Sequence, residues 1–426
     1  MRTETQPATT SRYRDAAIEI GDNLVAGASA ETLGVTWVGD DLVGTDENNT
    51  SVIHGPVGPD FYGGAAGIAW FLGHLARATA SPVYADVARA GLAFSLSTAR
   101  REFCPASLSL YSGAAGVALA AAEVADALDD MDLRREAFAL ARDIANSIIA
   151  GATIEMNDLL SGLAGVSIGL LALHRMSGDS LYLDAARLAC KYLMGRRSHS
   201  WWGDSWPDHE GQPALCGLGH GASGIGLALA EAAWVTGDAS LLDAAHAAFT
   251  YERSHFARER SAWPDLRKPE SPGWTTAWCH GGLGIGAVRL RLYEATGDDW
   301  ALAEASAALL AARGLAVQAG RDAAQGIAHD ATLCHGLGGV TELILLASEI
   351  LKLPEHSQAA CRLADLCLKI KSLNGGKWTT GLAGCADVPG LFTGIAGVGV
   401  TMLRIGNPAA IGSPMLPGRP VITAKR

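Results

Sequence analysis

Two Cys-His pairs stand out in this chain as residues that could bind a metal. They are Cys279-His280 and Cys334-His335, and a glycine follows each pair directly. Thiolate and imidazole ligands favour zinc over magnesium or calcium. Two cysteines and one histidine leave the fourth tetrahedral position open, which is typical of a catalytic rather than a structural zinc. The sequence therefore predicts one zinc ion per chain, held by Cys279, Cys334 and His335, with His280 beside it.

Two more residues could move protons next to such a metal. His220 directly precedes a glycine, as His280 and His335 do, and Asp158 lies four residues before another glycine. Imidazole titrates near neutral pH, so His220 is the best candidate for a general acid. Two roles are open to Asp158: it could orient His220 or favour its charged form, or it could cap the helix that follows.

These residues belong to a repeat that fills nearly the whole chain. Seven copies of Gly-x-x-Gly recur, with 49 to 60 residues between their first glycines. A period of this length indicates supersecondary units that stack to share a core. Residues just before equivalent glycines should then lie at one height and converge on one rim. The seven copies begin at Gly64, Gly113, Gly162, Gly221, Gly281, Gly336 and Gly394.

Each copy predicts a helical hairpin. A nearly all-apolar segment with helical spacing follows each glycine step, and an amphipathic segment comes next. Three of the turns between them read Gly178-Asp179, Gly237-Asp238 and Gly297-Asp298, where glycine permits a left-handed helix end and Asp can cap the next helix. The last copy is as apolar as the others, whereas open solenoids end in polar capping repeats. We therefore expect an all-α fold, an α/α toroid of seven inner and seven outer helices.

The predicted toroid spans residues 58–410, with residues 1–57 as an N-terminal extension and residues 411–426 as a C-terminal tail. Valine and isoleucine in residues 33–57 suggest a short β-hairpin. Two longer inserts precede the fourth and fifth copies, a Trp-rich one at 195–213 and a charged one at 252–272. Each is expected either to lie over the mouth of the ring or to be a surface elaboration.

Composition limits the partners and the compartment. The net charge of −11 makes a nucleic-acid backbone an improbable partner. The start of the chain, residues 1–14, is polar and lacks the apolar stretch of a secretory signal, and the apolar runs are too short to span a bilayer. Eight cysteines in 426 residues are too few for a disulfide scaffold. We expect a soluble cytoplasmic protein with no membrane span.

The residues around the two Cys-His pairs resemble the zinc signature of lanthipeptide cyclases, the LanC and LanC-like family. The matching segments are Ala277-Trp278-Cys279-His280-Gly281-Gly282 and Leu333-Cys334-His335-Gly336. Seven glycine-step repeats are also that family's framework, so the resemblance covers almost the entire chain. It implies an α/α toroid in which zinc activates a cysteine thiol. That thiol then adds to dehydroalanine or dehydrobutyrine in a ribosomal peptide and closes a thioether ring.

The resemblance also implies roles for individual residues. Cys279, Cys334 and His335 match the family's zinc ligands. His220, within Gly219-His220-Gly221, matches its acid/base histidine, and Asp158 matches the catalytic aspartate near that histidine.

Two positions depart from the pattern of some members. Thr275 stands where they carry Arg, four residues before the first zinc cysteine, and His280 stands where they carry Tyr, directly after it. Both leave open how the enolate formed by thiol addition is stabilised. We assign Thr275, Trp278 and His280 to contact with the substrate or with the metal ligands.

Several functions fit this sequence. The leading one is a stand-alone cyclase acting on a dehydrated precursor peptide, partnered by a separate dehydratase and possibly a transporter complex. A second keeps the zinc but adds glutathione to dehydrated residues. A third is a non-catalytic peptide-binding scaffold with a vestigial zinc site. A glycosidase toroid would need paired carboxylates at its mouth, and only Asp158 is well placed for that.

Overall fold

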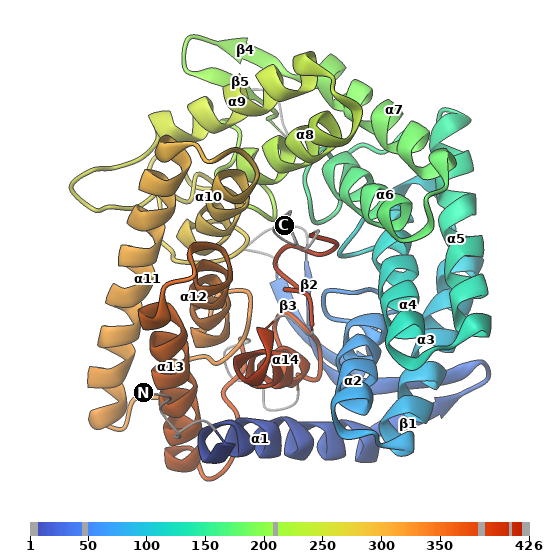
Figure 1. Ribbon diagram of the computed structural model, residues 1–426, viewed down its shortest axis with the longest axis vertical. Coiled ribbons are helices and arrows are strands. Elements are labelled where there is room, and N and C mark those ends of the chain that lie inside the picture. Colours follow the sequence, from blue (N-terminus) through green and yellow to red (C-terminus); the bar gives the residue numbers. More distant parts are fainter. Residues whose placement is uncertain (1–6, 45–49, 208–211, 382–387, 409–410, 420–426) are drawn as a thin grey trace.

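The computed structural model describes residues 7–44, 50–207, 212–381, 388–408 and 411–419. Two concentric rings of helices make up the molecule (Figure 1). Each helix of the inner ring starts directly after the first glycine of a Gly-x-x-Gly step. The inner helices are α2 (Ala65–Thr79), α4 (Ala114–Leu128), α6 (Leu163–Ser177), α8 (Ala222–Thr236), α10 (Gly282–Thr296), α12 (Leu337–Leu351) and α14 (Ile395–Gly406).

An outer helix covers each inner helix. Six of them follow their inner partner in sequence, while the seventh, α1 (Pro7–Ala26), comes from the start of the chain and packs on α14. Because α14 also packs on both α12 and α2, the ring is closed, which confirms the predicted toroid. The N-terminal segment thus supplies one wall of the ring. The other outer helices are α3 (Pro82–Arg101), α5 (Met131–Ile149), α7 (Ser180–Arg196), α9 (Ala239–Ser254), α11 (Asp299–Ala324) and α13 (Pro354–Leu373).

The second glycine of each step is needed because an inner helix turns back tightly against the loop before it. A Cβ on Gly284 would lie 2.1 Å from the carbonyl oxygen of Trp278, and one on Gly339 would lie 2.2 Å from that of Leu333. The same close approach to a carbonyl six residues earlier recurs at every copy. Glycine therefore recurs because the backbone leaves no room for a side chain.

We predict that Gly284→Ala destabilises the fold by about 2 kcal/mol, since the methyl group would force the backbone of the Cys279 loop to move. Gly282 is the matched control: it lies in the same helical turn, and a Cβ there meets nothing within 4 Å. Gly282→Ala should be neutral or slightly stabilising because alanine favours helix more than glycine does. Urea denaturation of both variants measures the difference, and equal stabilities would contradict this explanation of the repeat.

Backbone hydrogen bonds join the seven loops before the inner helices into a closed circle. In each loop, the carbonyl two residues before the step glycine accepts an N–H from the preceding loop. The N–H of Phe392 donates to the Tyr62 carbonyl over 2.9 Å, which links the last copy to the first. The other carbonyls in the circle are those of Tyr111, Leu160, Gly219, Cys279, Cys334 and Phe392. Both candidate zinc cysteines thus lie on one circular rim.

The turns between paired helices largely follow the sequence prediction. Gly178, Gly237 and Gly297 all adopt the left-handed conformation, with φ between 73° and 75°. The side chains of Asp179 and Asp238 accept N–H groups of the next helix. The third expected cap is wrong: Asp298 precedes α11 without a capping bond from its side chain among the described residues.

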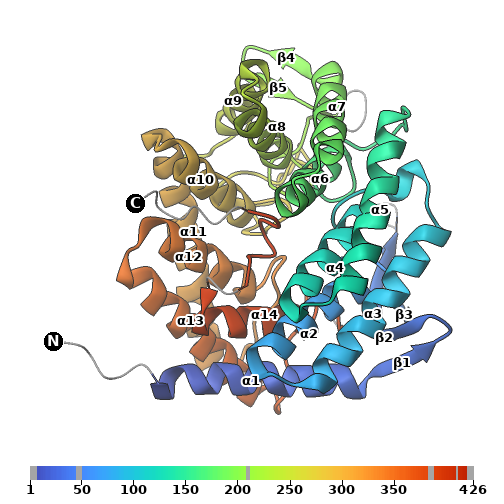
Figure 2. The same ribbon diagram turned by 45° about the vertical axis from the view of Figure 1, so that its right-hand side comes forward.

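Besides the helices of the two rings, the described ranges contain five strands. Strands β1 (Ala28–Glu31), β2 (Gly34–Gly44) and β3 (Thr50–Pro56) form an antiparallel sheet in that order, which contains the hairpin expected in residues 33–57. Strands β4 (Ser198–Ser200) and β5 (Gly203–Ser205) form a hairpin in the Trp-rich insert. This hairpin packs on the outer helix α9 (Figure 2), which favours the surface elaboration over the mouth for this insert.

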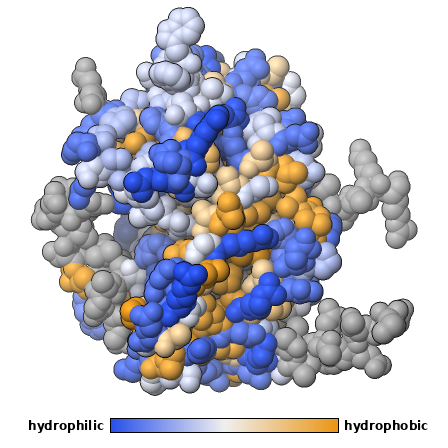
Figure 3. Space-filling model, turned by 90° about the vertical axis from the view of Figure 1, so that its left-hand side faces the viewer, coloured by the Kyte–Doolittle hydropathy of each residue, from blue (hydrophilic) through white to orange (hydrophobic). Residues whose placement is uncertain are grey.

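One outer face of the ring is rich in apolar side chains (Figure 3). It lies over α11 and α13, where Leu310 and Val317 are more than half exposed, and hollows of about 510 and 700 Å³ lie between side chains of these helices and their inner partners. Among the described residues, α11 alone is long and apolar enough to cross a bilayer by length and composition. In the fold it is the outer partner of α10.

Candidate metal centre and proton-transfer site

The two candidate zinc cysteines meet at the rim. Cys279 precedes α10 and Cys334 precedes α12, and the Cys334 thiol donates a hydrogen bond to Cys279 with 3.4 Å between the Sγ atoms. Their loops are also joined directly, since the N–H of Trp278 donates to the Cys334 carbonyl over 2.6 Å. Neighbouring copies of the repeat therefore bring together two thiols that are 55 residues apart in sequence.

The electrostatics of this pair favour a thiolate. The hydrogen bond from Cys334 lowers the pKa of Cys279 to about 6, aided by the positive charges of His220 and His335. The same bond, together with burial, raises the pKa of Cys334 well above its usual range. Two thiolates bound tetrahedrally to one zinc at about 2.3 Å would lie roughly 3.8 Å apart. The sulfur spacing and chemistry thus suit a shared zinc ion.

His335 lies on the same loop, and a carboxylate holds its ring. Its Nδ1 is 2.7 Å from the Oδ2 of Asp330, and this bond raises the pKa of His335. Asp330 is in turn fixed by the N–H and hydroxyl of Thr332. A carboxylate on Nδ1 leaves Nε2 for a metal, which is the usual arrangement around zinc-bound histidine. A Cβ on Gly381 would lie 2.3 Å from the His335 ring, so glycine there makes room for it.

Asp330 is not among the candidate site residues that the sequence predicts, and it lies six residues before the step glycine Gly336. The loop folds back, so that Asp330 reaches His335 five residues later. Within the described ranges, no group of three or more His, Cys, Asp and Glu side chains is already close enough to hold an ion. The two thiols are in contact, and His335 lies on the loop that carries Cys334.

We predict that Asp330→Asn weakens zinc binding by about tenfold or more, because the amide neither holds the ring as firmly nor increases its basicity. Competition with a chromophoric chelator would measure the affinity. Asp322→Asn serves as the control, since Asp322 makes an equally short bond of 2.7 Å to His329. Equal zinc affinities of the two variants would show that Asp330 does not contribute to zinc binding.

The second pair of candidate residues is also in contact. Nδ1 of His220 is 2.7 Å from the Oδ2 of Asp158, whose side chain is only 2% exposed. The other carboxylate oxygen accepts the N–H of Ser161 over 2.7 Å. Helix α6 begins after Gly162, so Asp158 binds His220 and the loop rather than capping that helix. A carboxylate on Nδ1 keeps the proton there and leaves Nε2 to act on a substrate.

A buried ionic network supports the loop that carries His220. The Glu252 carboxylate accepts the N–H of Gly217 over 2.8 Å, and it pairs with Arg289 of α10 over 2.8 Å. Both charged side chains are fully buried. Removing one partner of such a pair leaves the other charge buried and unpaired, which is strongly destabilising. The network therefore links the His220 loop to the helix that follows Cys279.

His280 lies between the two halves of the site. Its ring stacks on that of His220, with 4.8 Å between centroids and 15° between planes. Burial, with a further contribution from the charge of His220, lowers the pKa of His280 to about 3, so its ring stays neutral at pH 7. Its Nδ1 has no hydrogen-bond partner within the described part of the chain. His280 is thus a neutral ring that stacks on His220.

The other two predicted contact residues differ in burial. Trp278 is fully buried and packs in an aromatic cluster with Tyr111 and Phe392, at centroid distances of 4.8 and 4.5 Å. Thr275 is exposed. The charged insert brings Arg267 near the site, where its charge contributes to lowering the pKa values of both Cys279 and His280. That guanidinium donates a fork of hydrogen bonds to the Asp265 carboxylate, which holds it in place.

The fold and this site define a closed α/α toroid with a thiol pair, a His–Asp pair and a second histidine–carboxylate pair at one rim. The family model of lanthionine synthetase C-like proteins matches residues 55–416. The chain belongs to this family.

The chain is similar to several solved structures, of which nisin cyclase shares the fold. Nisin cyclase is 20% identical over 83% of this chain and 89% of its own, with a TM-score of 0.63. An inactive variant of the α-1,6-mannanase of Salegentibacter sp. and the cellobiose 2-epimerase of Spirochaeta thermophila cover 94% and 95% of this chain and 100% and 99% of their own chains. Their identities are 12% and 14%, each with a TM-score of 0.48. No curated protein matches the sequence.

Proposed function

We propose that this protein is a zinc-dependent lanthionine cyclase that acts on a dehydrated precursor peptide. The contact between the Cys279 and Cys334 thiols, on the same rim as the His220–Asp158 pair, carries the proposal. Membership of the lanthionine synthetase C-like family supports it. The described α-helices of this chain all belong to the toroid. A separate dehydratase would therefore supply the dehydroalanine or dehydrobutyrine.

Cys279, Cys334 and His335 would hold the zinc. When bound, zinc would supply a positive centre that keeps a substrate thiol deprotonated near pH 7. The bond from its Nδ1 to Asp330 would leave Nε2 of His335 available to the ion. Trp278, which precedes Cys279, is fully buried in an aromatic cluster with Tyr111 and Phe392.

The reaction joins the substrate thiolate to the β-carbon of the dehydro residue. As the S–C bond forms, the electron pair of the C=C bond moves onto the α-carbon and its carbonyl, giving an enolate. A proton from Nε2 of His220 forms the new C–H bond at the α-carbon, and the proton lost by the thiol restores the imidazole through solvent. Asp158 fixes the ring with Nε2 toward the rim. No atoms are gained or lost, so product and substrate are isomers.

The enolate needs a positive or hydrogen-bonding neighbour, and Thr275 carries no charge. Arg267 offers that charge from the insert between α9 and α10, held by its fork with Asp265. A cation fixed beforehand stabilises developing negative charge without reorganisation during the reaction.

The test is ring closure in a synthetic peptide that contains one cysteine and one dehydroalanine. Because cyclisation does not change the mass, the product is counted by its failure to react with iodoacetamide, followed by mass spectrometry. Loss of the free thiol that depends on the protein and on zinc supports the proposal. In parallel, glutathione is offered to the same peptide with its cysteine replaced by serine. Gain of one glutathione without ring closure would favour the glutathione-adding alternative, and no reaction of either kind would favour the scaffold.

A further inference from the structure

The C-terminal segment 411–419 runs into the middle of the ring (Figure 1). Its side chains are buried for the most part: Ile411, Ser413, Met415 and Leu416 are each less than 9% exposed. None of these residues belongs to the seven-copy repeat. A chain end packed inside a ring of helices contacts many of them at once, which gives it the means to set their spacing.

One part of this segment contacts the residue that precedes Cys279. The Tyr111 hydroxyl donates to the Pro414 carbonyl over 2.9 Å, and the Trp278 indole N–H donates to the Met415 carbonyl over 3.4 Å. Trp278 is fully buried and is the residue before Cys279. The segment therefore supplies the partner that a buried indole N–H requires, and it does so one residue away from a candidate ligand.

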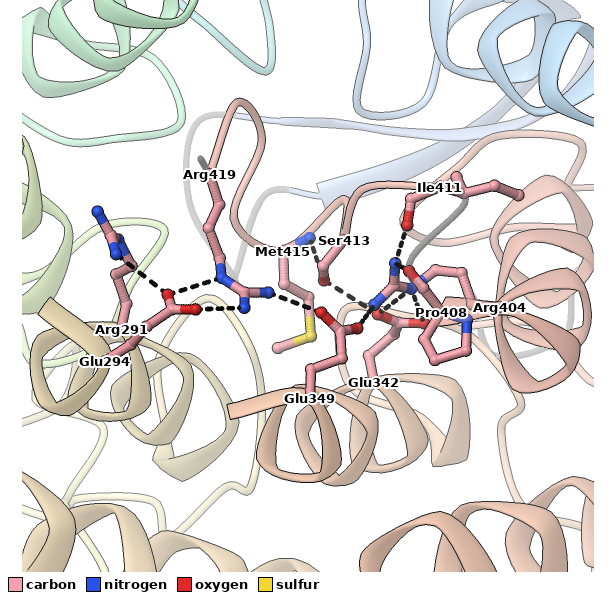
Figure 4. Close-up of polar contacts among 10 residues, drawn as sticks. All are labelled: Arg291, Glu294, Glu342, Glu349, Arg404, Pro408, Ile411, Ser413, Met415 and Arg419. Carbon is pink, nitrogen blue, oxygen red and sulfur yellow. Dashed lines mark hydrogen bonds and ion pairs between the residues drawn. The ribbon is translucent and has the colours of Figure 1, made fainter. Parts of the chain in front are cut away.

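The other end of the segment bridges two inner helices (Figure 4). Arg419 pairs with both carboxylate oxygens of Glu294 on α10, at 2.7 and 2.9 Å, and with Glu349 on α12 at 2.8 Å. Its side chain is only 11% exposed. A guanidinium held by two carboxylates at low exposure is a strong, directional link.

The two helices that Arg419 joins are those that carry the thiols. Cys279 lies just before α10 and Cys334 just before α12, while Glu294 and Glu349 lie in the last turns of the same helices. A change in spacing at one end of a helix pair is transmitted to the other end, because packed helices move as rigid bodies. Arg419 is thus placed to affect the separation of the two sulfurs.

Further contacts anchor the segment. The Arg175 guanidinium of α6 donates to the Gly418 carbonyl over 2.7 Å, and Ser413 donates to the buried Glu342 of α12 over 3.0 Å. Gly418 has a φ of +67°, and a Cβ there would lie 2.3 Å from the Cβ of Ala172. The segment consequently fits only with glycine at this position, which provides a way to displace it without changing a charge.

We infer that segment 411–419 is an internal brace for the metal centre, with Arg419 as its positioning residue. It sets the spacing of α10 and α12 and, through Trp278, the position of the Cys279 loop. The inference rests on the proposed function in that it takes Cys279 and Cys334 as metal ligands. It goes further by placing control of their separation in a part of the chain outside the repeat.

The experiment compares the full-length protein with Arg419→Ala and Gly418→Val, all measured well below their melting temperatures. Arg100→Ala is the matched control, because Arg100 joins the outer helices α3 and α5 through Glu136 in the same way, away from the thiols. Two quantities are measured: the zinc dissociation constant, by chelator competition, and the rate at which metal-free protein forms a Cys279–Cys334 disulfide with a mild oxidant. Peptide mapping by mass spectrometry follows the disulfide.

Both brace variants are expected to bind zinc about tenfold more weakly or worse and to form the disulfide severalfold more slowly, while Arg100→Ala matches the wild type. Wild-type zinc affinity and disulfide rate in both brace variants, with lowered melting temperatures, would overturn the inference and leave the segment with a role in stability alone. Absence of zinc from the wild type would count against the proposed function, and the disulfide rates would then decide the brace on their own.

Discussion

His220→Ala should lower the rate of ring closure by about 10²- to 10⁴-fold while zinc remains bound. The imidazole is held by Asp158 over 2.7 Å and stacked on the neutral ring of His280, so it is fixed in a single orientation at the rim. Its loss removes the proton donor to the α-carbon and leaves the thiol pair in place. Single-turnover kinetics with the synthetic peptide, together with zinc analysis of the same sample, would measure both effects.

The control for this prediction is His199→Ala. Nδ1 of His199 makes the same 2.7 Å bond to an aspartate, Asp204, but on the β4–β5 hairpin at the outer ring. It should leave the rate unchanged. Zinc loss from His220→Ala would mean that His220 is a ligand rather than an acid. A wild-type rate of ring closure in His220→Ala would show that His220 takes no part in the reaction.

Cys279→Ala should abolish zinc binding and ring closure together. A site with two thiolates and one imidazole cannot lose a thiolate and still hold the ion tightly, since soft ligands provide most of the affinity. The loss also removes the acceptor for the Cys334 thiol, which burial would then leave protonated. Elemental analysis and the peptide assay would be run on one preparation.

Cys361→Ala is the matched control, because Cys361 is a half-buried free thiol on the outer helix α13, like Cys279 in exposure but far from the rim in sequence and position. It should keep both zinc and activity. A Cys279→Ala protein that closes rings at the wild-type rate would exclude a metal-bound thiol from the mechanism.

The sequence was sufficient to predict the closed ring of helices and the positions of the two cysteines on its rim. Each step glycine recurs because the backbone of the preceding loop leaves no space for a Cβ, so the pattern marks a geometry and not only a helix start. Counting back from each glycine placed Cys279 and Cys334 at equivalent positions, and the circle of backbone hydrogen bonds runs through the carbonyls of both. A repeat makes such a prediction possible because equivalent residues share a height in the ring.

Residues outside the repeat could not be found in this way. Asp330 reaches His335 because its loop folds back, and no periodic pattern encodes that turn. Arg419 lies 125 residues from Glu294 and 70 from Glu349, in a segment with no copy elsewhere in the chain. The sequence left open whether the Trp-rich insert lies over the mouth or on the surface, and only the fold shows that β5 packs on α9. Long-range pairs of single residues carry no local signal, and only the fold brings them together.

The most direct test of the zinc-dependent account is the zinc content of the purified protein, measured by elemental analysis for the wild type and for Cys334→Ala in parallel. The account predicts about one zinc per wild-type chain and essentially none in the variant, because Cys334 is one of only three protein ligands. A wild-type protein that carries no zinc after metal-free purification and saturation with zinc would contradict it, as would a Cys334→Ala protein that retains the full complement.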